Sequence, residues 1–294
     1  MMNYQAVYKN YLDQCENTLD NICEQYLPDT SATARAAKYS LRSGGKRVRA
    51  VLVLAVCDML NGDCSAAAQL AGAVEMLHCY SLIHDDLPCM DNDDMRRGKP
   101  SCHKAFDEAT ALLAGDLLLT ESFEVIANID TTDIIRANAT RALARGAGIG
   151  GMIYGQELDL FYETVQADEA QLRQIHQNKT GALINAAVQL GAVAGGADSK
   201  TSELLAQYAS ALGLVFQIVD DVLDETSTAE ELGKPIGSDK ENGKTTFVTL
   251  YGVDGAMALA DKINTENCNQ MQATFGEHAA FLTALAEQLL VRRS

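Results

Sequence analysis

The stretch AAAQLAGAVEMLHCYSLIHDDLP, residues 66–88, decides the fold class of this chain. Most of its positions are apolar, and its side chains do not alternate between apolar and polar as they would in a half-buried strand. Pro88 ends the run, because proline cannot continue a regular helix. The stretch therefore predicts a long buried helix that leads directly into two adjacent aspartates, Asp85 and Asp86.

Helical patterns run along almost the whole chain, which has only four prolines and no repeat or Pro/Ser linker. Several of the expected helices are apolar around most of their circumference, as in the central layer of a large helical bundle. We therefore predict a single all-α domain over residues 1–294. The expected helices lie at about 4–27, 48–60, 66–87, 103–129, 132–149, 168–193, 201–225, 245–265 and 275–292.

The charge balance excludes some classes of partner. Lys and Arg total 23 against 40 Asp and Glu, which gives a net charge of −17, and so acidic a chain repels nucleic acid and anionic membrane surfaces. The longest apolar runs are far shorter than the ~20 residues of a membrane span, so we expect no stable membrane insertion. A phosphorylated substrate would need metal ions or clustered cations to overcome the repulsion locally.

The cysteines and the first residues indicate a compartment. The eight cysteines contain no C-x-x-C pair, which argues against a zinc site and favours free thiols in a reducing environment. The first twenty residues carry acids and no apolar run, unlike a signal or transit peptide. We expect a cytoplasmic protein.

A first acidic cluster closes the helix predicted at 66–87. Asp85 and Asp91 would point apart on a straight helix, but the break at Pro88 lets the chain turn Asp91 back. Clustered carboxylates suit Mg²⁺, and a solvated acidic turn is the simpler alternative. The five carboxylates are those of Asp85, Asp86, Asp91, Asp93 and Asp94.

A second acidic cluster, Asp220, Asp221, Asp224 and Glu225, closes the helix predicted at 201–225. Asp220 and Asp224 share one helix face with Gln217. Four acids at a helix C-terminus repel one another and oppose the helix dipole, which is costly without a bound cation. Two such clusters, each ending an apolar helix, favour a shared divalent-metal site over two solvated surfaces.

Two basic runs interrupt the acidic background. Residues 44–49 read GGKRVR and open the helix at 48–60, and residues 96–99 read RRGK and follow the first acidic cluster. Glycines and cations at a helix start are typical of phosphate binding, with solvated charges as the alternative. The first run is not a Walker A loop, because Ser40 and Arg47 stand where that loop requires Gly and Ser or Thr.

Two further residues allow two interpretations each. Lys179 falls on the apolar stripe of its helix, so it either extends its ammonium group to the surface or binds a buried anion. Taken alone, His78 is best interpreted as a core histidine.

Together these motifs resemble the trans-isoprenyl diphosphate synthases. The resemblance covers about residues 35–292 and implies an all-α fold of about ten core helices around a central cavity, usually in a homodimer. It also implies small-molecule isoprenyl diphosphates as substrates and Mg²⁺ as cofactor. The matching motifs are Asp85-Asp86-x4-Asp91 with Arg96-Arg97-Gly98, Phe216-Gln217 with Asp220-Asp221-x2-Asp224, Gly44-Gly45-Lys46-Arg47-x-Arg49, Lys179-Thr180, and Gly237-Ser238-Asp239-Lys240 with Lys244.

The resemblance implies a role for each matched residue. Asp85 and Asp91 would hold two Mg²⁺ ions and Asp220 a third, making three per active site. The Lys179 carbonyl, Thr180 and Gln217 would face the developing allylic cation and so make the catalytic contacts. Asp86, Asp221 and Asp224 would act through water; Arg96, Lys179, Thr180, Gln217, Lys234 and Lys244 would bind the allylic diphosphate; and Gly45, Lys46, Arg49, His78 and Arg97 would bind isopentenyl diphosphate.

One position bears on product length. Tyr80, followed by Ser81, lies five residues before Asp85, or ~7.5 Å along the helix, where the growing hydrocarbon tail would go. In related enzymes an aromatic residue there accompanies a C15 product and a smaller residue a C20 product. We therefore expect farnesyl diphosphate, made from isopentenyl and dimethylallyl or geranyl diphosphate. Geranylgeranyl diphosphate is the alternative product, and a core tyrosine without a role in chain length is the alternative for Tyr80.

The chain departs from the family pattern at two places. Ala50 stands where the basic run usually ends in proline, and residues 153–157, IYGQE, are bulkier than the Gly-rich form often found there. Neither place carries a proposed ligand.

Three other classes of protein share parts of the pattern. A metal-dependent phosphohydrolase could use His84-Asp85 but needs a further His well upstream, and His78 is too near. A terpene cyclase would lack the Lys46 and Arg49 pair. A non-catalytic partner subunit of a prenyl synthase would tend to lose the acidic motifs, which are intact here.

Overall fold

The computed structural model describes residues 2–226 and 244–292, and this part of the chain is almost wholly helical, as predicted. A π-helical turn η1 (Gln177–Gly181), a 3₁₀ turn η2 (Gly276–Ala279) and a two-stranded hairpin, β1 (Met95–Arg96) with β2 (Lys99–Pro100), complete the regular structure. The helices are α1 (Tyr4–Tyr26), α2 (Ala32–Leu41), α3 (Val48–Met59), α4 (Cys64–Asp85), α5 (Cys102–Ala105), α6 (Glu108–Ala127), α7 (Asp133–Ala147), α8 (Met152–Tyr162), α9 (Glu169–His176), α10 (Ala182–Ala194), α11 (Ser199–Thr226), α14 (Phe247–Phe275) and α15 (Ala280–Leu290).

The expected boundaries were wrong at several places. Helices α2 and α8 were not predicted, and the loop through Pro100 contains the hairpin. The segment predicted as one helix at 103–129 is divided between α5 and α6, because Asp107 caps the start of α6 with a bond from the Thr110 amide. The segment predicted at 168–193 is divided by η1, and the helix predicted to end near 265 continues to Phe275.

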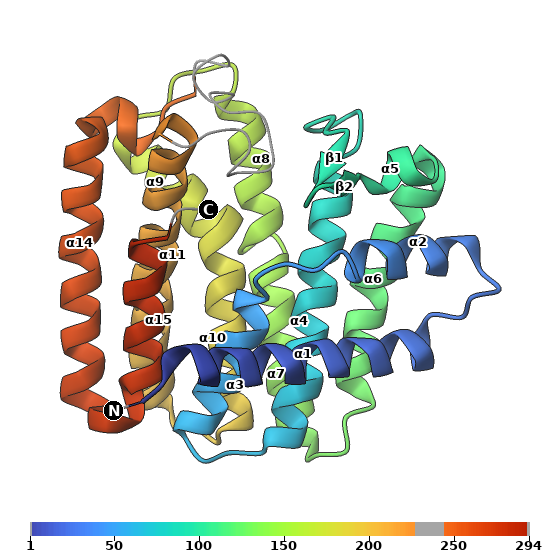
Figure 1. Ribbon diagram of the computed structural model, residues 1–294, viewed down its shortest axis with the longest axis horizontal. Helices are drawn as coiled ribbons and strands as arrows, with labels where there is room; N and C mark the ends of the chain where they lie inside the picture. Colours follow the sequence, from blue (N-terminus) through green and yellow to red (C-terminus); the bar gives the residue numbers. More distant parts are fainter. Residues whose placement is uncertain (1, 227–243, 293–294) are drawn as a thin grey trace.

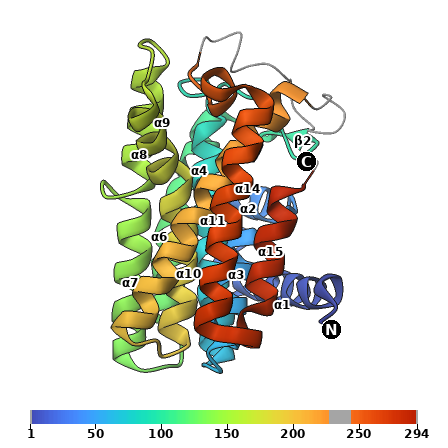
Figure 2. The same ribbon diagram turned by 90° about the vertical axis from the view of Figure 1, so that its left-hand side faces the viewer.

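The long helices lie side by side along one direction of the molecule, and α1 crosses them (Figures 1 and 2). Helix α3 is buried at every position from Val51 to Cys57, and α4 is buried at every position from Leu70 to Leu77. These two helices therefore form the central layer that their all-round apolar sequences predicted. A smaller hydrophobic cluster lies around Phe247, between α9, α11 and α14. The assignment of one domain to residues 1–294 stays a prediction.

The ends of two helices position the site. Helices α4 and α11 run in the same direction and both finish at the upper end of the bundle in Figure 1, where the hairpin follows α4. The first acidic cluster begins at the end of α4, and the second occupies the last turns of α11. Two segments separated by more than a hundred residues thus bring their carboxylates to one end of the bundle.

Helix α11 is long and apolar enough to cross a membrane by length and composition alone. It packs against α10 and α14 in the bundle, and Leu205, Leu212 and Val215 are fully or nearly fully buried there. A core helix of a helical bundle has the same composition.

The contact between α3 and α10 requires a glycine. A Cβ atom on Gly191 would lie 2.5 Å from the Val53 carbonyl oxygen and 2.8 Å from the Val56 Cβ. We predict that Gly191→Ala lowers the free energy of unfolding by about 1–3 kcal/mol, because the helices must move apart. Urea denaturation measures it, with Gly150→Ala as control, since a Cβ there meets its nearest atom at 3.7 Å. Equal losses in the two variants would contradict the packing argument.

Candidate active site

The turn after α4 reverses the chain as the sequence predicted. The Asp91 amide donates a hydrogen bond to the Asp85 carbonyl oxygen at 2.8 Å, and the Asn92 amide donates to the Leu87 carbonyl oxygen at 3.1 Å. Asn92 has a φ of 53°, in the left-handed region that asparagine tolerates better than most residues. The turn therefore places the acidic side chains on both sides of Pro88 at one end of α4.

Burial opposes the ionisation of three carboxylates of the first cluster, those of Asp85, Asp86 and Asp91. It raises the pKa of Asp85 to about 6, with Lys179 acting against the shift and Asp91 adding to it. Burial also raises the pKa of Asp86 and of Asp91 above their usual values. Carboxylates in this condition gain from any cation that approaches them.

A cavity of about 490 Å³ joins the two clusters. Asp91 and Asp93 line it from the first cluster, and Asp220, Asp221 and Asp224 line it from the second. Lys179, Thr180, Gln217 and Lys244, all singled out from the sequence, line it as well. The structure therefore brings together most of the residues predicted for the metal ions and the allylic diphosphate.

The second cluster is fixed by partners that the sequence did not reveal. The Phe247 amide, at the start of α14, donates to Asp221 Oδ2 at 2.7 Å. The His176 ring stacks on the Phe247 ring with centroids 5.7 Å apart, and its Nε2 lies 3.9 Å from Asp221 Oδ2. Burial lowers the pKa of His176 to about 4, so this histidine is neutral at pH 7.

Asp220 contacts a residue near the C-terminus. Arg292 Nη2 lies 2.6 Å from Asp220 Oδ1 and 2.9 Å from the Phe216 carbonyl oxygen, and its guanidinium lies 3.8 Å from the centroid of the Phe216 ring. No sequence signal singled out Arg292, because 72 residues separate it from Asp220. The arginine compensates a carboxylate that the family pattern assigns to metal binding.

The lysines of the cavity share an acidic partner on α8. Lys179 Nζ lies 2.6 Å from Asp159 Oδ2, and Lys244 Nζ lies 3.5 Å from the same oxygen. Lys179 stands on η1, and α8 approaches η1 so closely that a Cβ on Gly155 would lie 2.0 Å from the Lys179 amide nitrogen. Asp159 was not predicted as a site residue. Residues 153–157 do not line the cavity in the part of the chain that the structure describes.

A second group of cations lies at the start of α3. Burial lowers the pKa of Arg49 to about 10, and the Arg49 Nε is buried with no hydrogen-bond partner among the described atoms. Burial, together with Arg49 and Arg97, holds the pKa of His78 well below its usual range. Burial lowers the pKa of Lys46 too, and Arg292 adds to the effect. Arg49, Arg97 and His78 therefore lie near enough to influence one another electrostatically.

Gly45 and the Arg97 guanidinium lie in close contact. Arg97 donates to the Gly44 carbonyl oxygen, and a Cβ on Gly45 would lie 2.7 Å from the Arg97 guanidinium carbon. Gly45 also has a φ of 127°, which other residues rarely adopt. Arg47, in contrast, is buried and pairs with two glutamates. Its Nε donates to Glu16 at 2.8 Å, and its Nη1 lies 3.5 Å from Glu75.

Arg96 is turned toward a carboxylate of the first cluster. Its Nε donates to Asp86 Oδ1 at 2.9 Å, and its Nη2 contacts both Asp86 and Asp93. Asp86 is buried, so this pair neutralises a charge that would otherwise be costly.

Tyr80 is buried on α4, one turn and a half below Asp85. Its ring meets the His84 ring edge-on with centroids 5.6 Å apart, and the Ser81 hydroxyl donates to the His78 carbonyl oxygen at 2.8 Å. Neither Tyr80 nor Ser81 lines the cavity between the acidic clusters.

Lys234 and the motif at 237–240 lie outside the described residues.

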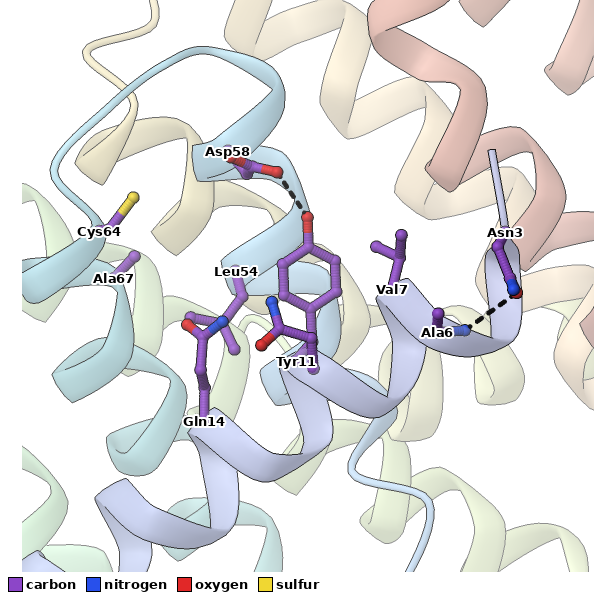
Figure 3. Close-up of a pocket in the computed structure, with 10 residues that line it drawn as sticks. Asn3, Ala6, Val7, Tyr11, Gln14, Leu54, Asp58, Cys64 and Ala67 are labelled. Atoms are coloured by element: carbon purple, nitrogen blue, oxygen red, sulfur yellow. Dashed lines mark hydrogen bonds between the residues drawn. The ribbon is translucent and has the colours of Figure 1, made fainter. Parts of the chain in front are cut away.

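A separate hollow of about 410 Å³ lies between α1, α3 and the start of α4 (Figure 3). The Tyr11 hydroxyl donates to Asp58 Oδ2 at 2.7 Å within it, and amide side chains such as Gln14 line its edge. It contains none of the residues singled out from the sequence.

Comparison with known proteins decides the family. Residues 30–282 match the polyprenyl synthetase family. The chain belongs to that family. The resemblance to trans-isoprenyl diphosphate synthases is thereby confirmed, and the phosphohydrolase alternative is excluded.

Named relatives of this synthase family differ in product. The chain is 42% identical over 266 residues to a large subunit of a heterodimeric chloroplast geranylgeranyl pyrophosphate synthase of Arabidopsis thaliana, covering 88% of this chain and 72% of that protein. It is also 42% identical over 258 residues to the farnesyl diphosphate synthase of Geobacillus stearothermophilus, covering 86% and 87%.

Solved structures of synthases share the fold. An FPP/GFPP synthase of Zymomonas mobilis matches with a TM-score of 0.88 and 35% identity, over 98% of this chain and 100% of that one. A geranyltransferase of Helicobacter pylori, solved with magnesium and isoprenyl diphosphate, matches with a TM-score of 0.83 and 35% identity, over 96% and 98%. The predicted fold class is confirmed.

The carboxylates of this synthase fit the magnesium on which the family depends. Mg²⁺ binds through one or two carboxylates together with waters and substrate phosphates. No three Asp, Glu, His or Cys side chains among residues 2–226 and 244–292 converge on one point. An ion in this cavity would therefore complete its coordination with waters or with oxygen atoms of a bound diphosphate.

The raised pKa of Asp85 has a consequence for stability. Its pKa of about 6 exceeds the ~3.9 of an unfolded aspartate, so the folded state binds the proton more tightly and ionisation of Asp85 costs stability progressively between pH 4 and 6. We predict that Asp85→Asn stabilises the metal-free protein at pH 7 by on the order of 1–2 kcal/mol and not at pH 4.

Denaturant unfolding in chelator at both pH values measures the effect, with the exposed Asp130→Asn as control. If Asp85→Asn were less stable than the wild type at pH 7, the ionised Asp85 side chain would stabilise the fold, and the prediction would be wrong.

Proposed function

We propose that this chain is a short-chain trans-prenyltransferase that makes farnesyl diphosphate from isopentenyl diphosphate and dimethylallyl or geranyl diphosphate. The observation that carries the proposal is the cavity between the acidic clusters, where carboxylates of the turn after α4 and of α11 line the same space as Lys179 and Lys244. Such a site suits a substrate that brings both an anionic diphosphate and metal ions. Membership of the polyprenyl synthetase family supports the reaction class.

We assign Asp85 and Asp91 to two Mg²⁺ ions and Asp220 to a third, with Asp221 and Asp224 acting through water. Bound Mg²⁺ would supply positive charge to the leaving diphosphate. Asp86 would act indirectly, since it already pairs with Arg96. Lys179 and Lys244 would bind the allylic diphosphate, and the same role is proposed for Arg96 and Lys234.

The chemistry needs no protein nucleophile. The allylic C–O bond breaks and the diphosphate leaves with the electron pair; the double bond of isopentenyl diphosphate then attacks C1, and the diphosphate takes the proton lost from the new cation. The Lys179 carbonyl, Thr180 and Gln217 would turn negative dipole ends toward the allylic cation. Buried helices around the site would exclude water that would capture the cation.

Isopentenyl diphosphate would bind at the second cation group, through Lys46, Arg49, His78, Arg97 and the backbone at Gly45. The unpartnered Nε of Arg49 supports this assignment, because a buried donor without an acceptor is costly until an anion arrives. Neutral His78 could donate one further hydrogen bond to a phosphate oxygen.

We propose a C15 product because of the position of Tyr80. Its buried ring, beside His84 on α4, would close the space below the acidic cluster to a longer hydrocarbon chain. Relatives are named for both farnesyl and geranylgeranyl products, so geranylgeranyl diphosphate is the second candidate.

We also propose a cytoplasmic homodimer with one domain over residues 1–294. Two adjacent leucines of α6, Leu112 and Leu113, are 47% and 53% exposed, and a second copy of the chain would cover them.

The proposed function is tested by incubation with isopentenyl and dimethylallyl diphosphate. We predict prenyl transfer to C15 with Mg²⁺, complete loss in chelator and recovery on adding Mg²⁺. Asp220→Ala should lower turnover by at least ~10²-fold, as loss of an electrostatic contact to the leaving group does. Asp130→Ala is the surface control. Full turnover in chelator would contradict the metal assignment.

Product length is tested on Tyr80. We predict that Tyr80→Ala shifts the product from C15 toward C20 or longer, because removal of the ring opens space along α4. Chromatography of the dephosphorylated products measures the shift, and Tyr26→Ala, on α1 and distant in sequence from the motif, controls for loss of a tyrosine. An unchanged product distribution would remove Tyr80 from the account of chain length.

A further inference from the structure

Asp159 is an acidic residue of the cavity that lies outside both acidic motifs. It stands on α8, and its side chain is only 18% exposed. The same oxygen, Oδ2, lies 2.6 Å from Lys179 Nζ and 3.5 Å from Lys244 Nζ. One carboxylate thus contacts both of the described lysines assigned to the allylic diphosphate.

These two lysines come from different parts of the chain. Lys179 belongs to η1, and Lys244 lies shortly before the start of α14 at Phe247. Two ammonium groups that share one oxygen lie close together and repel each other at this distance. A single anion between them removes the repulsion and fixes both nitrogens on the cavity wall.

The backbone around Asp159 is built for this contact. Gly155, one turn earlier on α8, allows the helix to touch the Lys179 backbone, since any Cβ there would lie 2.0 Å from the Lys179 amide nitrogen. Burial alone would raise the pKa of Asp159, but Lys179 and Lys244 outweigh it and hold the pKa below its usual value. The carboxylate is therefore ionised at pH 7.

Another carboxylate of the same segment serves as a comparison. Glu163 Oε1 lies 2.9 Å from Lys244 Nζ, and its side chain is 38% exposed. It contacts Lys244 but not Lys179 in the described ion pairs, and its more exposed carboxylate is better screened by solvent than that of Asp159.

We propose that Asp159 is a positioning residue that holds Lys179 and Lys244 together as a paired cation site for the diphosphate of the allylic substrate. The proposal rests on the proposed function for the identity of that substrate, while the shared oxygen contact itself is independent of it. Asp159 acts through the lysines and touches no reacting atom.

The decisive variants separate charge from shape. Asp159→Asn keeps the shape and loses the charge, whereas Asp159→Glu keeps the charge and adds a methylene group. We expect Asp159→Asn to raise the KM for the allylic diphosphate at least ~10-fold, with the KM for isopentenyl diphosphate within about twofold, and Asp159→Glu to stay within about threefold of the wild type. If Asp159 acted only through packing, Asp159→Glu would raise the KM for the allylic diphosphate more than Asp159→Asn would.

A coupling experiment tests whether Asp159 acts through the lysines. In a Lys179→Met background, Asp159→Asn should change the allylic KM by less than about threefold, because one member of the pair is already gone. A tenfold effect in both backgrounds would overturn the proposal. Tighter allylic binding in Asp159→Asn would overturn it too, since the carboxylate would then compete with the diphosphate.

Binding of inorganic pyrophosphate with Mg²⁺, measured by calorimetry, separates this proposal from the proposed function. If the wild type transfers no prenyl group, the function fails, and the proposal still requires Asp159→Asn to weaken pyrophosphate binding at least ~10-fold. Glu163→Gln should weaken it by less than threefold, and Glu157→Gln, exposed on the same helix and outside the cavity lining, should leave it unchanged. Equal pyrophosphate binding by Asp159→Asn and the wild type, or none by either, would overturn the proposal.

Discussion

The gathering of carboxylates around one cavity at the end of the bundle is the constraint on which the rest of the structure depends. Burial raises the pKa of Asp85, Asp86 and Asp91, so the folded chain carries an electrostatic cost that only cations can remove. A fold held together by apolar burial can tolerate such a cost where function requires it. The largely buried helices α3 and α4 supply that stability beside the site.

Basic side chains of the protein offset part of this electrostatic cost. Arg96 neutralises Asp86, Arg292 contacts Asp220, and Lys179 and Lys244 meet at Asp159. Each of these contacts joins an acidic residue to a different element of the fold. The metal-free site is thereby kept assembled, and a substrate that brings magnesium and a diphosphate would replace only some of these partners.

Sequence periodicity was sufficient for the fold class, because α3 and α4 are apolar on all sides and α11 ends in a dense acidic motif. It missed α2, whose buried face consists mostly of alanines, and α8, whose apolar residues Leu160 and Phe161 are exposed. The motifs named most residues of the cavity. Asp159, His176 and Arg292 could not be found this way, because their roles arise from contacts with residues that are distant in sequence or outside the motif pairs.

The most direct test of this account is calorimetric titration of the wild-type protein with Mg²⁺, alone and with saturating inorganic pyrophosphate. Because no three acidic, His or Cys side chains of the described residues converge on one point, the acidic clusters alone should bind the ion weakly. With pyrophosphate, the account predicts at least tenfold tighter binding of more than one ion per chain. Mg²⁺ binding of the same strength and stoichiometry with and without pyrophosphate would contradict it.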